Sequence, residues 1–224
     1  MSGWFAAAHA ALVDFVALGG WVVALLLAIS VIAGAAVLWK LWDLAMLRVG
    51  PHPALAAALA DWQAGQRTAA MARLASGRSA LDRLAARAMA AGAPETLRPR
   101  LQAETEAHAA RAEAGLRLLD AIVQTAPLLG LFGTVLGMIE AFQTLQAGGS
   151  SVDPSQLAGG IWVALLTTAM GLGIAMPVSL FLSWTESRIA REAQGAALMV
   201  EVLCGPALPE TPETASRPLV AVQG

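Results

Sequence analysis

Cysteine, histidine and charged residues are all scarce in this sequence, and each shortage excludes a class of chemistry. The single cysteine, Cys204, excludes an intramolecular disulfide and a multi-cysteine metal site. The three histidines, His9, His52 and His108, stand at no ligand spacing from one another, so zinc and heme sites have no support. The formal net charge of -2 and the lack of a basic tract with interleaved aromatic residues disfavour nucleic acid. We therefore expect no cofactor, no metal and no nucleic-acid partner.

Hydrophobic residues dominate what remains. They make up 57% of the 224 residues, whereas charged residues make up 13%, and the mean hydropathy is +0.63. This composition lies outside the usual soluble range and indicates a protein of the lipid bilayer. Three apolar runs are long enough to cross a hydrocarbon core of about 30 Å as helices, and they cover residues 18–41, 118–146 and 157–184. A cleaved signal peptide is the alternative for the first run, but no Lys or Arg precedes it and it exceeds a typical signal core.

The basic residues predict how these spans are oriented. All 14 Lys and Arg lie within residues 40–117 or 188–217. By the positive-inside rule, the N-terminal segment 1–17 and the turn 147–156 face the periplasm, and the large loop and the C-terminus face the cytoplasm.

The remaining segments predict an all-α protein. The loop 42–117 is alanine-rich with regular charges and reads as a cytoplasmic helical domain. From Glu95 no strong breaker is evident before the second span, so we expect one long helix that extends below the membrane. The third span likewise continues as a cytoplasmic helix over residues 185–204. The tail 205–224 holds four prolines and is expected to be disordered.

Two spans carry a stripe of small residues on one helical face. In the second span the stripe consists of Ala126, Gly130, Thr134, Gly137 and Ala141. In the third span it consists of Ala164, Thr168, Gly171, Ala175 and Ser179. Such stripes allow close helix packing in which each Thr bonds its own preceding turn, or they line a lumen or a groove for another helix.

Acidic groups are nearly absent from the spans. Glu140 is the one carboxylate in their apolar part, and its place near the periplasmic end favours snorkelling to the interface. A protonatable group for ion transfer would therefore have to come from another chain. Pro127 and Pro177 predict kinks in the second and third spans.

The two spans resemble a known family. Residues 126–142, which read APLLGLFGTVLGMIEAF, are similar to the second-span motif of the MotA/TolQ/ExbB proton-channel proteins, and residues 157–177 are similar to their third-span motif. Three spans match ExbB and TolQ, whereas MotA has four. The resemblance implies a homopentamer in the bacterial inner membrane, around a pore that holds the helices of an ExbD/TolR-like partner whose aspartate carries protons. Energy would pass from there to a TonB-like or TolA-like protein.

The resemblance also assigns residues. Thr134 and Thr168 take the places of pore-facing threonines, and with Thr167 they are expected to line the proton pathway. The residues expected to serve helix packing and kinks are Pro127, Gly130, Gly133, Gly137, Gly171 and Pro177. Val163 stands where many ExbB relatives have a glutamate, which agrees with a carboxylate supplied by the partner.

Three functional classes compete on this evidence. The Gly19-Gly20-Trp21 entry to the first span and the Thr167-Thr168 pair favour an ExbB-like over a TolQ-like energy-transducing subunit. A structural membrane scaffold is the alternative if the small stripes only pack helices. An intramembrane enzyme would need a nucleophile with a base, or a metal pair, and the spans contain no such set, so we expect no enzyme.

Overall fold

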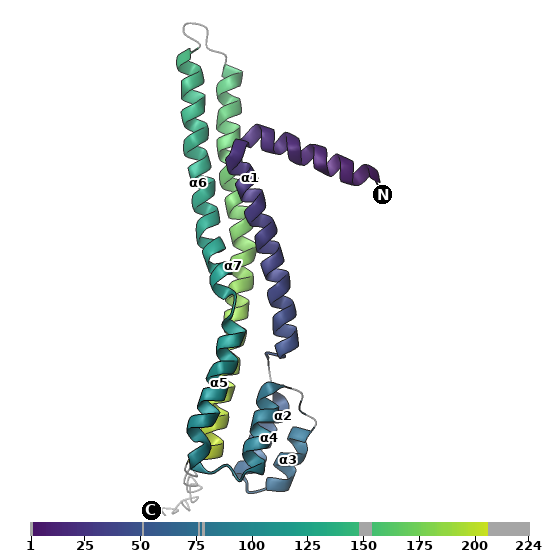
Figure 1. Ribbon diagram of the computed structural model, residues 1–224. Helices are drawn as coiled ribbons and strands as arrows, with labels where there is room; N and C mark the ends of the chain where they lie inside the picture. Colours follow the sequence, from purple (N-terminus) through teal and green to yellow (C-terminus); the bar gives the residue numbers. More distant parts are fainter. Residues whose placement is uncertain (1, 51, 76, 78, 148–153, 206–224) are drawn as a thin grey trace, which may run out of the picture. The chain divides into compact units, whose positions relative to one another are not determined.

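The computed structural model describes residues 2–50, 52–75, 77, 79–147 and 154–205. Every element in these residues is helical, which confirms the all-α class (Figure 1). The chain divides into two compact units, residues 1–50 with 109–192 and residues 51–108 with 193–224. We call them the membrane unit and the helical unit. Most of the turn and the tail expected at 147–156 and 205–224 lies outside the described residues.

Three helices of the membrane unit are long and apolar enough to cross a bilayer, as the sequence predicted. They are α1 (Ser2–Leu47), α6 (Leu116–Ala147) and α7 (Pro154–Cys204). Helix α1 is kinked at Gly20, whose φ of 62° and ψ of -161° are not helical. The apolar part that can span the membrane therefore begins at Gly20, and α1 runs six residues beyond the predicted end at 41.

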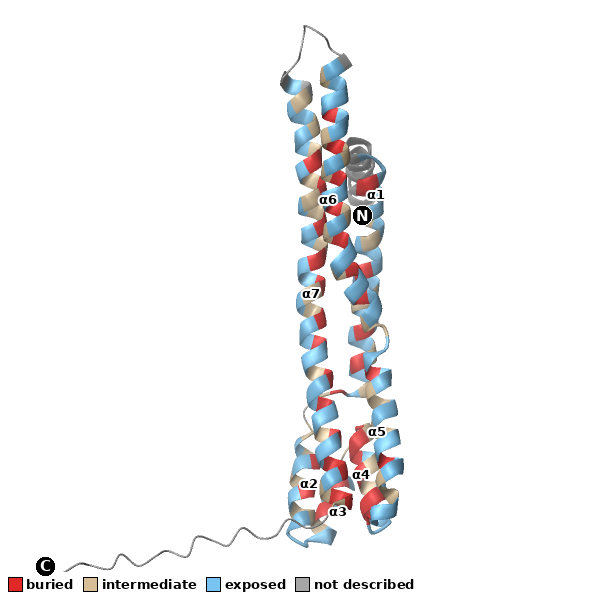
Figure 2. Cartoon of the chain, turned by 90° about the vertical axis from the view of Figure 1, so that its left-hand side faces the viewer, coloured by how far each residue is buried: buried red, intermediate tan, exposed pale blue. Residues whose placement is uncertain are grey.

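The three helices pack through two apolar clusters in the membrane unit. The first joins Ala33 of α1 to Leu119 and Ile122 of α6 and to Val178 and Leu182 of α7. The second cluster consists of Leu44, Val49, Ala112 and Ile189. Figure 2 shows buried residues along the sides on which the helices face one another. Large apolar side chains on the outer faces stay exposed, as expected where lipid or another protein surrounds a span.

The helical unit has short helices with clear sequence signals at their ends. Its elements are α2 (Pro53–Gln63), α3 (Arg67–Ala75), α4 (Ala80–Ala90), the 3-10 helix η1 (Glu95–Leu97), part of α5 (Arg98–Glu113) and the end of α7. Ser79 and Asp82 form a capping box at the start of α4. Leu55, Leu81, Leu101 and Met199 belong to its buried core. The helices of the loop thus pack with the end of α7 in one compact unit.

One expectation about the helices is wrong. The helix that starts near Glu95 does not continue unbroken into the second span, because α5 ends at Glu113 and α6 begins at Leu116. Gly115 adopts φ +83°, a left-handed conformation that interrupts an α-helix and that glycine adopts at low cost. The ring of Trp39 fills the space beside it, only 2.5 Å from where a Cβ would lie. In the sequence, Gly115 was the residue that could have indicated this break, but a single glycine is also tolerated inside helices.

Candidate functional site

The small residues of α6 and α7 pack directly against each other. A Cβ placed on Gly130 would lie 2.7 Å from the Thr167 carbonyl oxygen, and one on Gly171 would lie 2.5 Å from the Ala126 carbonyl oxygen. A Cβ on Gly137 would lie 3.1 Å from that of Ala164. Backbone contacts this short leave no room for a side chain. Within one protomer, the two stripes thus face each other over much of their length.

Thr167 lies inside this helix pair. Its side chain is only 1% exposed, and its Oγ1 is 2.7 Å from the Ala164 carbonyl oxygen and 3.2 Å from that of Gly130. A Cβ on Gly133 would lie 2.5 Å from the same Oγ1, so the absent side chain of Gly133 makes the space that Thr167 fills. One hydroxyl proton therefore serves a carbonyl of its own helix or one of the neighbouring helix.

Thr134 and Thr168 are half-buried at the edge of the helix pair. Thr168 donates its hydroxyl proton to the Gly130 carbonyl oxygen across the interface at 3.2 Å. Thr134 donates its proton to the Leu131 carbonyl oxygen of its own helix at 2.6 Å. A hydroxyl that donates its proton inward keeps two lone pairs that can accept a hydrogen bond. Each of the two oxygens can thus accept a further hydrogen bond.

The prolines do not end either helix. Pro127 lies inside α6 and Pro177 inside α7, and both helices continue beyond them. Pro127 stands one turn before Gly130, at the level where the two helices are closest. Glu140 is exposed, and Val163 is half-buried. In the described residues where α6 and α7 pack most closely, the polar side chains are thus hydroxyls and not carboxylates.

Comparison with known proteins decides the family. The profile of the MotA/TolQ/ExbB proton channel family matches residues 73–197, which is more than half of the chain. The chain belongs to the MotA/TolQ/ExbB proton channel family. It is thus a multi-pass membrane protein of a channel and transport family, and within this family it is most like ExbB.

The ExbB likeness comes from individual relatives. The chain is 47% identical over 81 residues to the biopolymer transport protein exbB1 of Vibrio cholerae. The matched stretch covers 34% of this chain and 36% of the relative. The chain is 46% identical over 85 residues to an ExbB-like protein of Synechocystis sp., covering 37% and 34%. It is 42% identical over 71 residues to ExbB of Neisseria gonorrhoeae, covering 31% of each. The matches thus span about a third of the length of these curated relatives.

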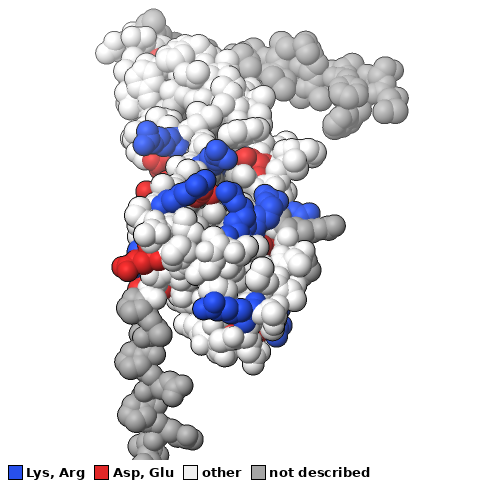
Figure 3. Space-filling view, turned by 60° about the horizontal axis from the view of Figure 1, so that its bottom comes forward, with Lys and Arg blue, Asp and Glu red and all other residues white. Residues whose placement is uncertain are grey.

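Lys and Arg are scarce in the apolar spans of this ExbB-like chain. Figure 3 shows Lys and Arg side chains gathered on one part of the surface, beside a part that is largely white. Among the residues of the membrane unit whose burial the structure describes, one charged residue is nevertheless fully buried, namely Lys40 of α1. Lys40 lies within the first predicted span, residues 18–41, and is not among the residues that the sequence predicts to form a site. The spacing of the sequence could have indicated its burial. The intervals between Ala33, Val37, Lys40 and Leu44 place them on one face of α1, which is buried.

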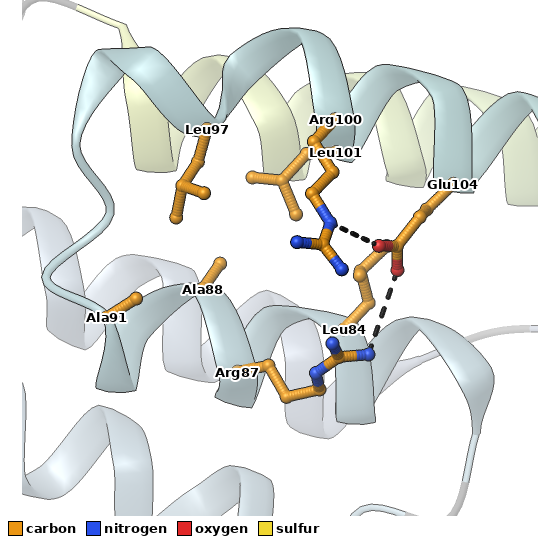
Figure 4. A pocket seen from close by; sticks show the side chains of 8 residues that line it. All are labelled: Leu84, Arg87, Ala88, Ala91, Leu97, Arg100, Leu101 and Glu104. Carbon is orange, nitrogen blue, oxygen red and sulfur yellow. Dashed lines mark hydrogen bonds and ion pairs between the residues drawn. The ribbon is translucent and has the colours of Figure 1, made fainter.

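The helical unit holds a small hollow between α4 and α5 (Figure 4). Leu84, Leu97 and Leu101 give it an apolar lining. Arg87 and Arg100 both approach the carboxylate of Glu104 at its rim, at 3.8 Å and 3.1 Å. The charged groups at this rim thus pair with one another, and the hollow offers no arrangement of nucleophile and base.

Proposed function

We propose that this chain is the channel-scaffold subunit of a proton-motive-force-driven motor in the bacterial inner membrane. An ExbD-like single-span partner would supply the proton-binding aspartate, and the complex would energise a TonB-like protein for uptake across the outer membrane. Support comes from the family, from relatives named biopolymer transport protein, and from three apolar helices. Where the described residues of α6 and α7 pack most closely, they meet through glycines and threonines and not through carboxylates. A TolQ-like role with TolR-like and TolA-like partners is the alternative within the same family.

The proposed assembly is a closed ring of identical subunits, five by the resemblance. Because α6 and α7 use their glycines against each other, the surfaces left for neighbouring copies are the exposed apolar faces of the spans. Leu128 and Leu180 are 64% and 75% exposed in the single chain, for example. In the proposed orientation the N-terminus lies in the periplasm and the C-terminus in the cytoplasm.

The observation that carries the mechanism is the direction of the two edge hydroxyls. Thr134 and Thr168 both donate to backbone carbonyls, so their oxygens are free to accept. An accepting oxygen stabilises the protonated form of a partner's carboxylic acid or a proton-carrying water, and rotation of the hydroxyl would let it donate to the ionised form. We propose that Thr134 and Thr168 assist proton transfer in this way. Thr167 would instead hold α6 and α7 together from inside.

Replacing Thr134 or Thr168 by Val tests this function, because Val keeps the shape and removes the hydroxyl. We expect proton uptake by liposomes that contain this chain and its ExbD-like partner to fall about tenfold, the effect of losing roughly 1.4 kcal/mol of hydrogen bonding in the rate-limiting state. Thr168→Ser should retain most of the uptake. Native mass spectrometry should show the same ring size for every variant.

Thr144→Val is the matched control for these variants. Thr144 is also in α6 and donates to a carbonyl of its own helix, that of Glu140, but it lies near the end of the helix. Its replacement should leave proton uptake unchanged. Full uptake by both Thr134→Val and Thr168→Val rings would make the hydroxyls packing groups and favour the scaffold interpretation. Stimulation by a TolR-like and not by an ExbD-like partner would favour the TolQ-like role.

A further inference from the structure

Lys40 is an unusual residue for a membrane span because its whole side chain is buried. Its Nζ donates to the Asp43 carboxylate at 2.9 Å and to the Ala114 carbonyl oxygen at 2.8 Å. The Asp43 side chain is 28% exposed, so only the Lys40 end of the pair is fully buried. Burying an ammonium is costly even when it is paired, and an apolar residue of similar size often serves stability as well. The stability of α1 alone does not explain Lys40.

The acceptor of the second hydrogen bond points to another role. Ala114 stands in the break between α5 and α6, where the helix ladder is interrupted at Gly115. Carbonyls at the end of a helix lack their intrahelical donors and need others. Lys40 supplies one such donor, and its neighbour Trp39 packs on Gly115 from the same helix. Two consecutive residues of α1 therefore hold the break.

A second stretch of irregular backbone in the membrane unit is held in a similar manner. After α1 ends at Leu47, Arg48 takes a positive φ of 53°. Arg188 of α7 donates from Nε to the Val49 carbonyl oxygen at 2.7 Å, and the Gly50 N–H donates to the Glu192 carboxylate at 2.9 Å. In the described part of the membrane unit, both departures from helix near this level thus bind a charged side chain from a different helix.

Lys40 also lies at a polar level between two apolar clusters. On α1 it follows Ala33 of the first cluster and precedes Leu44 of the second. On α7 the residue between the corresponding members, Leu182 and Ile189, is Thr185, which is fully buried with an Oγ1 that has no hydrogen-bond partner. Polar side chains inside an apolar core cost folding free energy, and they can determine which residues of neighbouring helices lie opposite each other.

We propose that Lys40 is a positioning residue, which holds the break at residues 114–115 against α1 so that α1 and α6 move together when the spans move. Its effect on transport rests on the proposed function, whereas its effect on the break does not. Without the Lys40 contact, the Ala114 carbonyl would lose its donor and the start of α6 would open more often.

Hydrogen exchange of the full chain in detergent measures the break directly. In Lys40→Met, a substitution of similar length without charge, we expect the amides of residues 114–119 to exchange about tenfold faster than in the wild type. Asp43→Asn keeps the Lys40 hydrogen bond to Ala114, so its exchange there should stay within about twofold of the wild type. Lys40→Arg should restore most of the protection because it keeps the charge and several donors.

Two further variants keep the test decisive. Thr185→Val removes a hydroxyl from the same level without touching the Ala114 contact, and it should leave exchange at the break unchanged. If Lys40→Met fails to fold, the double variant Lys40→Met with Asp43→Leu removes both charges and leaves neither unpaired. Unchanged exchange at residues 114–119 in a folded Lys40 variant overturns the proposal. An equal rise in exchange at residues 114–119 in Asp43→Asn and Lys40→Met overturns it too, because loss of the ion pair alone would then explain the effect.

The transport readout separates positioning from plain stability. In vesicles that contain the partners, the Lys40→Met ring should still take up protons. The amount of gradient-driven transport per proton taken up should fall. A parallel fall of both quantities would show a general loss of folded protein and count against the proposal. A wild-type chain without gradient-driven activity would instead refute the proposed function and leave the exchange result valid.

Discussion

At the scale of single residues, glycines determine how closely α6 and α7 approach. Gly130, Gly137 and Gly171 each have backbone or Cβ atoms of the other helix where their own side chain would lie. Lipid is as apolar as the side chains of a span, so helices in a bilayer associate through close packing and not by hiding from water. Each added methyl at this interface must therefore separate the two backbones.

Gly171→Ala tests the packing at one residue. A Cβ there would lie 2.5 Å from the Ala126 carbonyl oxygen, a backbone atom that cannot rotate away, and we expect a loss of about 1–3 kcal/mol in unfolding free energy. Gly173→Ala is the matched control two residues on in α7, where no atom lies within 4 Å. It should be neutral or stabilising by up to about 1 kcal/mol, because alanine favours a helix. Denaturation in detergent, followed by circular dichroism, measures both, and equal losses would contradict the packing.

The sequence allowed some of these residues to be found and not others. The periodicity of small residues identified Gly130, Gly137 and Gly171, because spacings of three and four place residues on one helical face. It did not separate Thr167 from Thr168, which are adjacent, although the first is 1% exposed inside the pair and the second lies half-buried at its edge. Adjacent residues of a helix point in directions only about 100° apart. The sequence does not locate the face that a neighbouring helix covers to within that angle.

At the scale of the elements, the break between α5 and α6 divides what looked like one long helix. The span itself was predictable, because its apolar length exceeds what a bilayer requires. The break was not, because glycine is compatible both with a helix interior and with the left-handed region. Tertiary contacts decide the conformation at Gly115, namely the Trp39 ring beside it and the hydrogen bond from Lys40 to Ala114. Neither contact is visible in the local sequence.

Gly115→Ala measures that tertiary contribution. Alanine at φ +83° carries backbone strain of about 1–2 kcal/mol, and its Cβ would also displace the Trp39 ring. Gly65→Ala is the control, because Gly65 has a similar φ of +74° but no atom within 4 Å of its Cβ position. We expect Gly115→Ala to lose more unfolding free energy than Gly65→Ala, by about 1 kcal/mol or more. Equal losses would mean that the Trp39 contact adds nothing.

At the scale of the whole molecule, the distribution of charge predicts the topology. The residues before position 40 and those between 118 and 187 carry no Lys or Arg. Segments without basic residues are translocated, and segments rich in them stay in the cytoplasm. The helical unit, which holds many of the basic residues, should therefore lie in the cytoplasm. The fold itself is compatible with either orientation, so the topology needs its own measurement.

Cysteine labelling in intact spheroplasts provides this measurement. A cysteine at Ser150, in the turn between α6 and α7, should react with an impermeant thiol reagent from outside, because this turn is expected in the periplasm. A cysteine at Ala91 should react only after lysis, and because Ala91 is exposed in the helical unit, the membrane and not burial would protect it. The reverse pattern would contradict the proposed orientation.

The unmodified chain sets the background for this experiment through Cys204. Its side chain is 6% exposed, and burial raises the pKa of the thiol, an effect that the nearby Arg98 opposes. The thiolate is the reactive form, so a raised pKa lowers its fraction at neutral pH and slows labelling. We expect Cys204 to react much more slowly than either introduced cysteine even after lysis, with a rate that rises as the pH approaches its pKa. Fast labelling of the unmodified chain in lysed cells would show that the core around Cys204 opens in the membrane-bound protein, and the Ala91 result would then need a Cys204→Ala background.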